Sequence, residues 1–304
     1  MWNKYTAAFI GALMLAGCQR VEEEINKEEP KEVIPEDVTE GYTLIVEASK
    51  GMDTKALSLD GSTLNAYWVN GEQVAVYLNG TKLGMLSATV DPVDNTKATI
   101  DGTLESISGV TENVVLTLLY PRAEWDYTDQ DGAEPSASGT LATKYDYATA
   151  FVTVATVDNG NRTITTTDGA SFANQQSMYR FGFKENGAGD KIAIKGFTVS
   201  SVNNALVRTR TWSGSDWTDT PGSITVTAAS TLTLPYASLR NTRVGSGNGD
   251  TYLFSVIGSD DALYLGSKDI PPSVMDVQGK FISAQSISVT KADMAKSGTA
   301  TEVW

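Results

Sequence analysis

The stretch Tyr42–Ser49, with the sequence YTLIVEAS, decides the fold class of this chain. Every second side chain in it is apolar. A period of two residues is typical of a β-strand that buries one face, because successive side chains point to opposite sides of a sheet. We expect the buried face of this first strand to consist of Tyr42, Leu44, Val46 and Ala48.

The same period returns along most of the chain, in runs rich in Val, Thr, Tyr and Phe, which favour strands. Pairs of Asn or Asp with Gly, such as Asn70-Gly71 and Asn159-Gly160, separate the runs and tolerate the positive φ of tight turns. Short alternating strands with regular turns predict an all-β chain of antiparallel sandwiches rather than βαβ units. The runs are Gln73–Leu78, Val114–Tyr120, Phe151–Val157, Tyr179–Phe183 and Tyr252–Val256.

The length predicts two domains. One sandwich of ~100 residues does not use up a chain of 304 residues, whereas two tandem sandwiches do. We place the N-terminal β-sandwich at 42–168 and the C-terminal β-sandwich at 169–304. The boundary is the pair Asp168-Gly169, where a hairpin ends and a new strand begins.

The N-terminus has the features of a bacterial lipoprotein signal. Lys4 precedes a short apolar core, and the run Leu15–Cys18 places two small residues before the only cysteine of the chain. Cys18 is therefore the predicted lipidation site, which would carry acyl chains such as palmitate and anchor the chain in the cell envelope. Residues 1–17 are the predicted signal peptide. Residues 18–41 are rich in Glu and are the predicted acidic tether.

Composition excludes several classes of function. The formal net charge is -14, so nucleic acid is not an expected partner, because phosphate binding needs clustered Lys and Arg. The chain has no histidine, which rules out Ser-His-Asp and Cys-His nucleophiles and His-ligated metals. No carboxylate pair stands out as general acid and base, so a carboxylate-based hydrolase is disfavoured. We expect no enzyme, no catalytic residue, no metal and no cofactor.

Two local patterns have a functional and an ordinary interpretation. The run Asp129–Gly132 is similar to part of a calcium loop, but Tyr127 and Ser138 would occupy the first and twelfth ligand positions, so the match fails. We therefore expect 126–139 to be a polar surface loop. Trp212 and Trp217 flank a turn, where they either pack across a hairpin or form an aromatic platform for a sugar.

The order of several motifs resembles the fimbrillin family, the lipoprotein precursors of type V pili. Behind the lipoprotein signal, the acidic tether and the first strand come Thr54-Lys55-Ala56 and then Leu64–Trp68. Gly71–Tyr77, with the sequence GEQVAVY, follows, and the chain closes on Thr301–Trp304, which is similar to a pilin terminus. The resemblance extends over essentially the whole chain.

The resemblance implies two transthyretin-like sandwiches and a structural subunit of adhesive fimbriae at the cell surface. In this family a trypsin-like protease cuts after a basic residue, the first strand leaves, and a C-terminal donor strand of another subunit fills the groove. Here the cut would fall between Lys55 and Ala56, with Lys50 as a rival, and would remove strand 42–49. The donor would lie near 281–304, and its candidate residues are Ile287, Val289, Val303 and Trp304.

The alternative function is a glycan-binding surface lipoprotein of the outer membrane. It would share the lipid anchor, the acidic tether and the tandem sandwiches. The pair Trp212 and Trp217 would then be its distinguishing feature, because aromatic faces stack on sugars.

Overall fold

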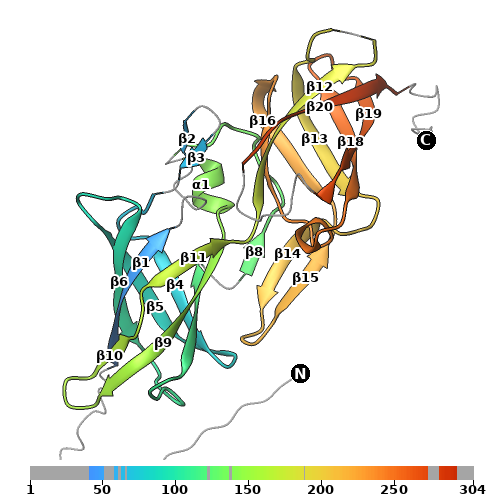
Figure 1. The fold of residues 1–304 in the computed structure, drawn as a ribbon. Helices are drawn as coiled ribbons and strands as arrows, with labels where there is room; N and C mark the ends of the chain where they lie inside the picture. Colours follow the sequence, from blue (N-terminus) through green and yellow to red (C-terminus); the bar gives the residue numbers. More distant parts are fainter. Residues whose placement is uncertain are drawn as a thin grey trace, which may run out of the picture. The chain divides into compact units, whose positions relative to one another are not determined.

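The computed structural model describes most of the chain and is built almost entirely of strands (Figure 1). All described residues belong to one compact unit. No helix among them is long and apolar enough to cross a membrane. The described residues are 41–50, 58–60, 63–65, 67–121, 124–136, 139–187, 189–272 and 281–292.

The first sheet closes into a barrel-like ring. Its strands follow the order β10-β1-β11-β9-β7-β4-β5-β6, and β1 also pairs with β6. Consequently β1 has a neighbour along both edges, antiparallel β6 on one side and parallel β10 and then β11 on the other (Figure 1). The strands are β1 (Tyr42–Lys50), β4 (Gln73–Leu78), β5 (Thr81–Val90), β6 (Lys97–Leu104), β7 (Val115–Tyr120), β9 (Ala148–Asp158), β10 (Thr163–Thr166) and β11 (Ala170–Asn174).

The expected alternation of the first strand is confirmed. Leu44, Val46 and Ala48 are buried in the core of the ring, whereas Ile45 points outward and is 51% exposed. Tyr42 is only partly buried, and it packs against the edge of the same core. The inward face does not stop at Ala48, because the last residue of β1 is also buried.

The second sheet has an aromatic core and holds the C-terminal strand. Its order is β16-β13-β18-β19-β20-β12-β17, so β20 lies between β19 and β12. Phe181, Phe183, Phe197 and Phe254 pack on one another with ring centroids 5.2–6.4 Å apart. The strands are β12 (Ser177–Glu185), β13 (Ile194–Ser201), β16 (Ile224–Leu232), β17 (Tyr236–Leu239), β18 (Asp250–Gly258), β19 (Leu263–Ile270) and β20 (Phe281–Lys291).

A third, small sheet joins strands from both halves of the sequence. The hairpin of β14 (Val207–Trp212) and β15 (Trp217–Pro221) pairs through β14 with β8 (Glu124–Asp126). At the tip of this hairpin, the amide of Gly80 in the β4–β5 turn donates to the carbonyl oxygen of Gly214 at 2.9 Å. The remaining elements are β2 (Ser58–Asp60), β3 (Thr63–Asn65), the short helix α1 (Thr140–Lys144) and the 3-10 turn η1 (Val244–Ser246).

Three details differ from the sequence-based expectation. The sheets are not purely antiparallel, since β1 pairs in parallel with β10 and β11, as β12 does with β20. The change from the first sheet to the second falls after β11, a few residues beyond the expected boundary at 168. The division into two domains, and their transthyretin-like type, stay predictions.

The expected surface loop at 126–139 is the third difference, because part of this segment is buried although Asp126, Asp129, Glu134 and Ser136 are exposed. Tyr127 is fully buried in the core of the second sheet, and Gln130 is 1% exposed. The Gln130 amide donates to the carbonyl oxygens of Tyr127 and Ser238, and its oxygen accepts the Ser238 amide. These bonds satisfy a polar side chain inside the protein, which composition alone classes as surface.

Candidate functional site at the end of the first strand

The last residue of β1 is a buried lysine. Lys50 follows the inward positions Val46 and Ala48 at the same spacing of two, and its side chain has no exposed surface. A charged side chain in such a place needs a partner of opposite charge. Its Nζ lies 2.5 Å from Oε2 of Glu72 and donates to the carbonyl oxygen of Tyr67 at 3.1 Å.

Aromatic rings enclose the ammonium group. Nζ lies 3.6 Å from the ring centroid of Trp68 and 4.8 Å from that of Tyr120. Trp68 in turn meets Tyr120 and Phe172 edge to face, at 5.9 Å and 5.4 Å between centroids. The negative faces of these rings favour a cation, so they supplement the ion pair.

The carboxylate of Glu72 collects donors from three parts of the barrel. Besides the ammonium of Lys50, Oε2 accepts the amide of Val69 at 3.1 Å, and Oε1 accepts the hydroxyl of Tyr120 at 2.5 Å. Gly71, with φ +84, makes the turn that presents Glu72 just before β4. The site is therefore formed by motif residues Trp68 to Glu72, by β7 and by the end of β1.

Burial changes the protonation behaviour of the site. Burial lowers the pKa of Lys50, and the negative charges of Glu72 and Asp146 partly offset this. Burial also raises the pKa of Tyr120, and the same two carboxylates raise it further. A lysine with a lowered pKa is what an amine nucleophile needs, but no substrate can reach a fully enclosed side chain. The arrangement holds a cation; it does not offer one for reaction.

The other residues predicted from the sequence are distributed as follows. Ile287 and Val289 lie in β20, and both are buried in the core of their own sheet. Their role as a donor strand stays a prediction. Cys18, Lys55, Ala56, Val303 and Trp304 lie outside the described residues.

The two tryptophans of the hairpin pack across it, as one of the two interpretations predicted. Trp212 and Trp217 are cross-strand partners with ring centroids 5.1 Å apart. Trp217 also lies 4.1 Å from the ring of Trp125, and the guanidinium of Arg210 lies 4.3 Å from its centroid. The Trp217 ring is thus engaged in packing. Sugar binding stays a prediction without a supporting contact.

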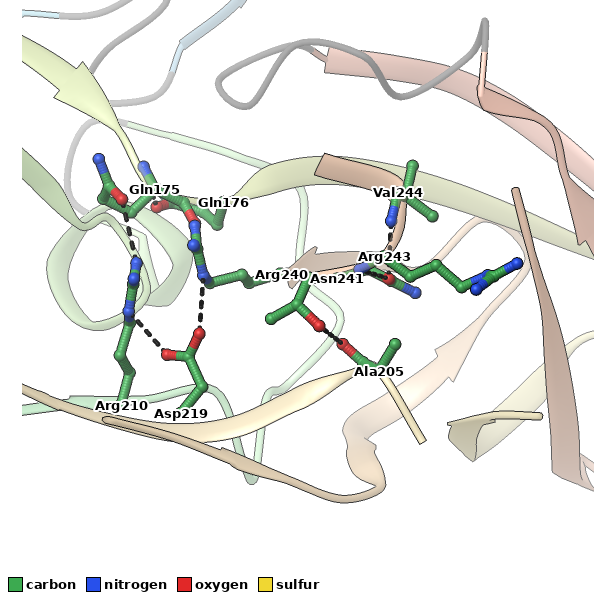
Figure 2. A network of polar contacts seen from close by, with 10 residues as sticks. Gln175, Gln176, Ala205, Arg210, Asp219, Arg240, Asn241, Arg243 and Val244 are labelled. Carbon is green, nitrogen blue, oxygen red and sulfur yellow. Dashed lines mark hydrogen bonds and ion pairs between the residues drawn. The ribbon is translucent and has the colours of Figure 1, made fainter. Parts of the chain in front are cut away.

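A network of arginines lies beside this hairpin (Figure 2). Nε of Arg210 and Nε of Arg240 lie 2.7 Å and 3.8 Å from the carboxylate of Asp219. Arg210 also donates to the side-chain oxygen of Gln175, and Arg240 donates to its carbonyl oxygen. The network links the end of β11 to β14 and β15. Over the described part of the chain, no group of three His, Cys, Asp or Glu residues could hold a metal ion.

Comparisons with known proteins return structural likenesses only. No protein-family model and no curated protein matches the sequence. A proposed cell adhesion protein from Bacteroides uniformis shares 14% identity at a TM-score of 0.42, over 82% of this chain and 96% of its own. One from Bacteroides ovatus shares 12% identity at 0.42, over 83% and 96%. A fimbrial protein from Bacteroides ovatus shares 10% at 0.32, over 82% and 50%. Similarities at this level establish neither a family nor a function.

Proposed function

We propose that this chain is a structural subunit of adhesive surface fimbriae. It is exported as a lipoprotein through Cys18 to the outer membrane, trimmed by a trypsin-like protease, and polymerised with other subunits by donor-strand exchange. The observation that supports this most directly is the place of β1. This strand closes the barrel-like ring along both edges.

Removal of β1 would open a groove with a strong tendency to be refilled. The facing edges of β6, β10 and β11 would lose their backbone partners, and the core around Leu44 and Val46 would be uncovered. Each Å² of uncovered apolar surface is unfavourable by roughly 25 cal/mol, and unpaired edges invite pairing. An extended strand of another subunit restores both the ladder and the burial.

The burial of Lys50 favours Lys55 as the cut site. A trypsin-like protease must take the whole basic side chain into its pocket, and the side chain of Lys50 is enclosed within the barrel. Cleavage between Lys55 and Ala56 would release the lipid together with β1. Release from the membrane and opening of the groove would then be one event.

The donor strand of this proposal comes from the end of the chain. Ile287 and Val289 lie in their own sheet through β20, and the amide of Ala292 still donates to the carbonyl oxygen of Leu263, so within this proposal we favour Val303 and Trp304 over Ile287 and Val289 as donor residues.

Limited proteolysis tests the proposal. Purified full-length chain treated with a trypsin-like protease should yield a fragment that begins at Ala56 and sediments as polymers in analytical ultracentrifugation. Intact mass identifies the cut. The control is Lys55→Gln, which should keep β1 and stay monomeric under the same treatment. A fragment that starts at Ala56 yet remains monomeric at high concentration contradicts the polymerisation mechanism.

A further inference from the structure

The groups around Lys50 form a binding slot for an ammonium group, and none of these groups belongs to β1. The carboxylate of Glu72, the carbonyl of Tyr67 and the ring of Trp68 lie in the segment before β4, and Tyr120 ends β7. All of them stay behind if β1 leaves. Resting on the proposed strand exchange, we propose that the groove selects donor strands that bring a lysine to the place of Lys50.

The argument begins with the charge that removal of β1 leaves behind. With Lys50 in place, the side chain of Glu72 is 16% exposed, and its other oxygen accepts the hydroxyl of Tyr120. A donor strand with an apolar residue at this position would cover a carboxylate without a counter-charge. Burial of an uncompensated charge is strongly unfavourable. A cation at the same position restores the pair.

The size of the slot favours lysine over arginine. Nζ of Lys50 is 2.5 Å from Glu72 and 3.6 Å from the Trp68 centroid, so the space fits one compact ammonium group between an oxygen and a ring. The carbonyl of Tyr67 accepts a second N–H. A guanidinium has five N–H donors in a wider planar fork, which this pair of acceptors does not satisfy.

The spacing along β1 defines the partner. Val46, Ala48 and Lys50 share the inward face, so the matching donor is an extended strand of another subunit with the pattern apolar-x-apolar-x-Lys. The apolar positions fill the core and are common to many strands. The lysine is the position at which one donor differs from another, so it determines which subunit joins.

Peptide binding to the trimmed chain tests the slot. Full-length chain is cut after Lys55, β1 is removed, and fluorescent nine-residue peptides with the sequence Tyr42–Lys50 are titrated by anisotropy. We expect the Lys50→Met peptide to bind at least about tenfold more weakly than the parent, as expected for loss of a buried ionic partner. The control peptide Glu47→Gln changes an outward, exposed side chain and should bind within about threefold of the parent.

A second chain variant ties the effect to the slot. In trimmed Glu72→Gln, the preference for the lysine peptide over the methionine peptide should fall below about threefold, because the counter-charge is gone. If the two peptides bind the unaltered trimmed chain equally, strand exchange stands and the lysine slot is wrong. If neither peptide binds, the groove itself does not accept strands, and both proposals fail.

Discussion

Replacement of Glu72 by Gln should destabilise the barrel far more than its partial exposure suggests. The substitution keeps the shape of the side chain and removes its charge. Lys50 then remains fully enclosed beside the Tyr67 carbonyl and two aromatic rings, and Asp146 is the carboxylate that still acts on its charge. Loss of one member of a buried ion pair costs about 3–5 kcal/mol.

Two physical limits narrow that range. The side chain of Glu72 is 16% exposed, so water screens part of the pair and the lower end applies. The lysine can also lose its proton, and neutralisation of an ordinary lysine at pH 7 costs ~4.6 kcal/mol, which is the upper limit. We therefore expect Glu72→Gln to lower the free energy of unfolding by about 3 kcal/mol.

The assay is urea unfolding at pH 7, followed by tryptophan fluorescence and linear extrapolation. The matched control is Glu47→Gln, which lies outward on β1 and should change stability by less than about 0.5 kcal/mol. The double variant Lys50→Met with Glu72→Gln should recover much of the loss, since neutral side chains of similar volume replace buried ion pairs well. A loss below about 1 kcal/mol for Glu72→Gln, or a double variant less stable than that single one, would refute the reasoning.

Three further outcomes follow from the structure. Burial raises the pKa of the enclosed tyrosines Tyr127, Tyr179 and Tyr252, so the folded state keeps protons that the unfolded state loses near pH 10. The free energy of unfolding, measured in urea, should therefore fall above pH 10 by about 1.4 kcal/mol per pH unit for each of these tyrosines. Gly214→Ala would place a Cβ 1.5 Å from the backbone of Gly80 and should lower the melting temperature. The decrease should be much larger than for the control Gly187→Ala, where φ is also positive but the added Cβ meets nothing within 4 Å. Gln130→Ala leaves three buried backbone groups without their hydrogen-bond partner and should lower the free energy of unfolding in urea by roughly 3 kcal/mol. The control Gln73→Ala changes an exposed side chain and should have little effect.

The sequence predicts that β1 is a strand, but it does not predict where β1 ends or which residue its last side chain contacts. The alternation that the sequence predicts from Leu44 to Ala48 is confirmed, because a period of two depends only on local backbone geometry. The predicted strand ends at Ser49, because the segment Ser49–Lys55 is polar and contains a glycine, which is typical of a loop. Yet Lys50 keeps the inward parity of the strand, and this parity was the available sign that a carboxylate must lie opposite.

The segment 126–139 shows why polar composition misleads. Polar residues of the types Asp, Glu, Gln, Ser and Thr make up most of it, and such residues usually lie on the surface. Gln130 is buried all the same, because two backbone groups of Ser238, 108 residues away, take up its hydrogen bonds. A local window cannot contain a partner at that distance. The sequence did not predict the parallel pairing of β1 and β12 for the same reason, because pairing direction depends on the path of the whole chain.

The sequence by itself determined that this chain is made of strands with one buried face and that tight turns fall at Asn70-Gly71 and Asn159-Gly160, and it predicts a lipoprotein signal before Cys18. Period, turn residues and signal features are local properties, so they can be read along the chain. Only the tertiary structure decided that β1 closes a ring between β6 and β10 with β11, and that Lys50 meets Glu72 and Tyr120. Those contacts join residues far apart in sequence. The need of a buried charge for a counter-charge predicts that such a partner exists, but only the fold determines which residue it is.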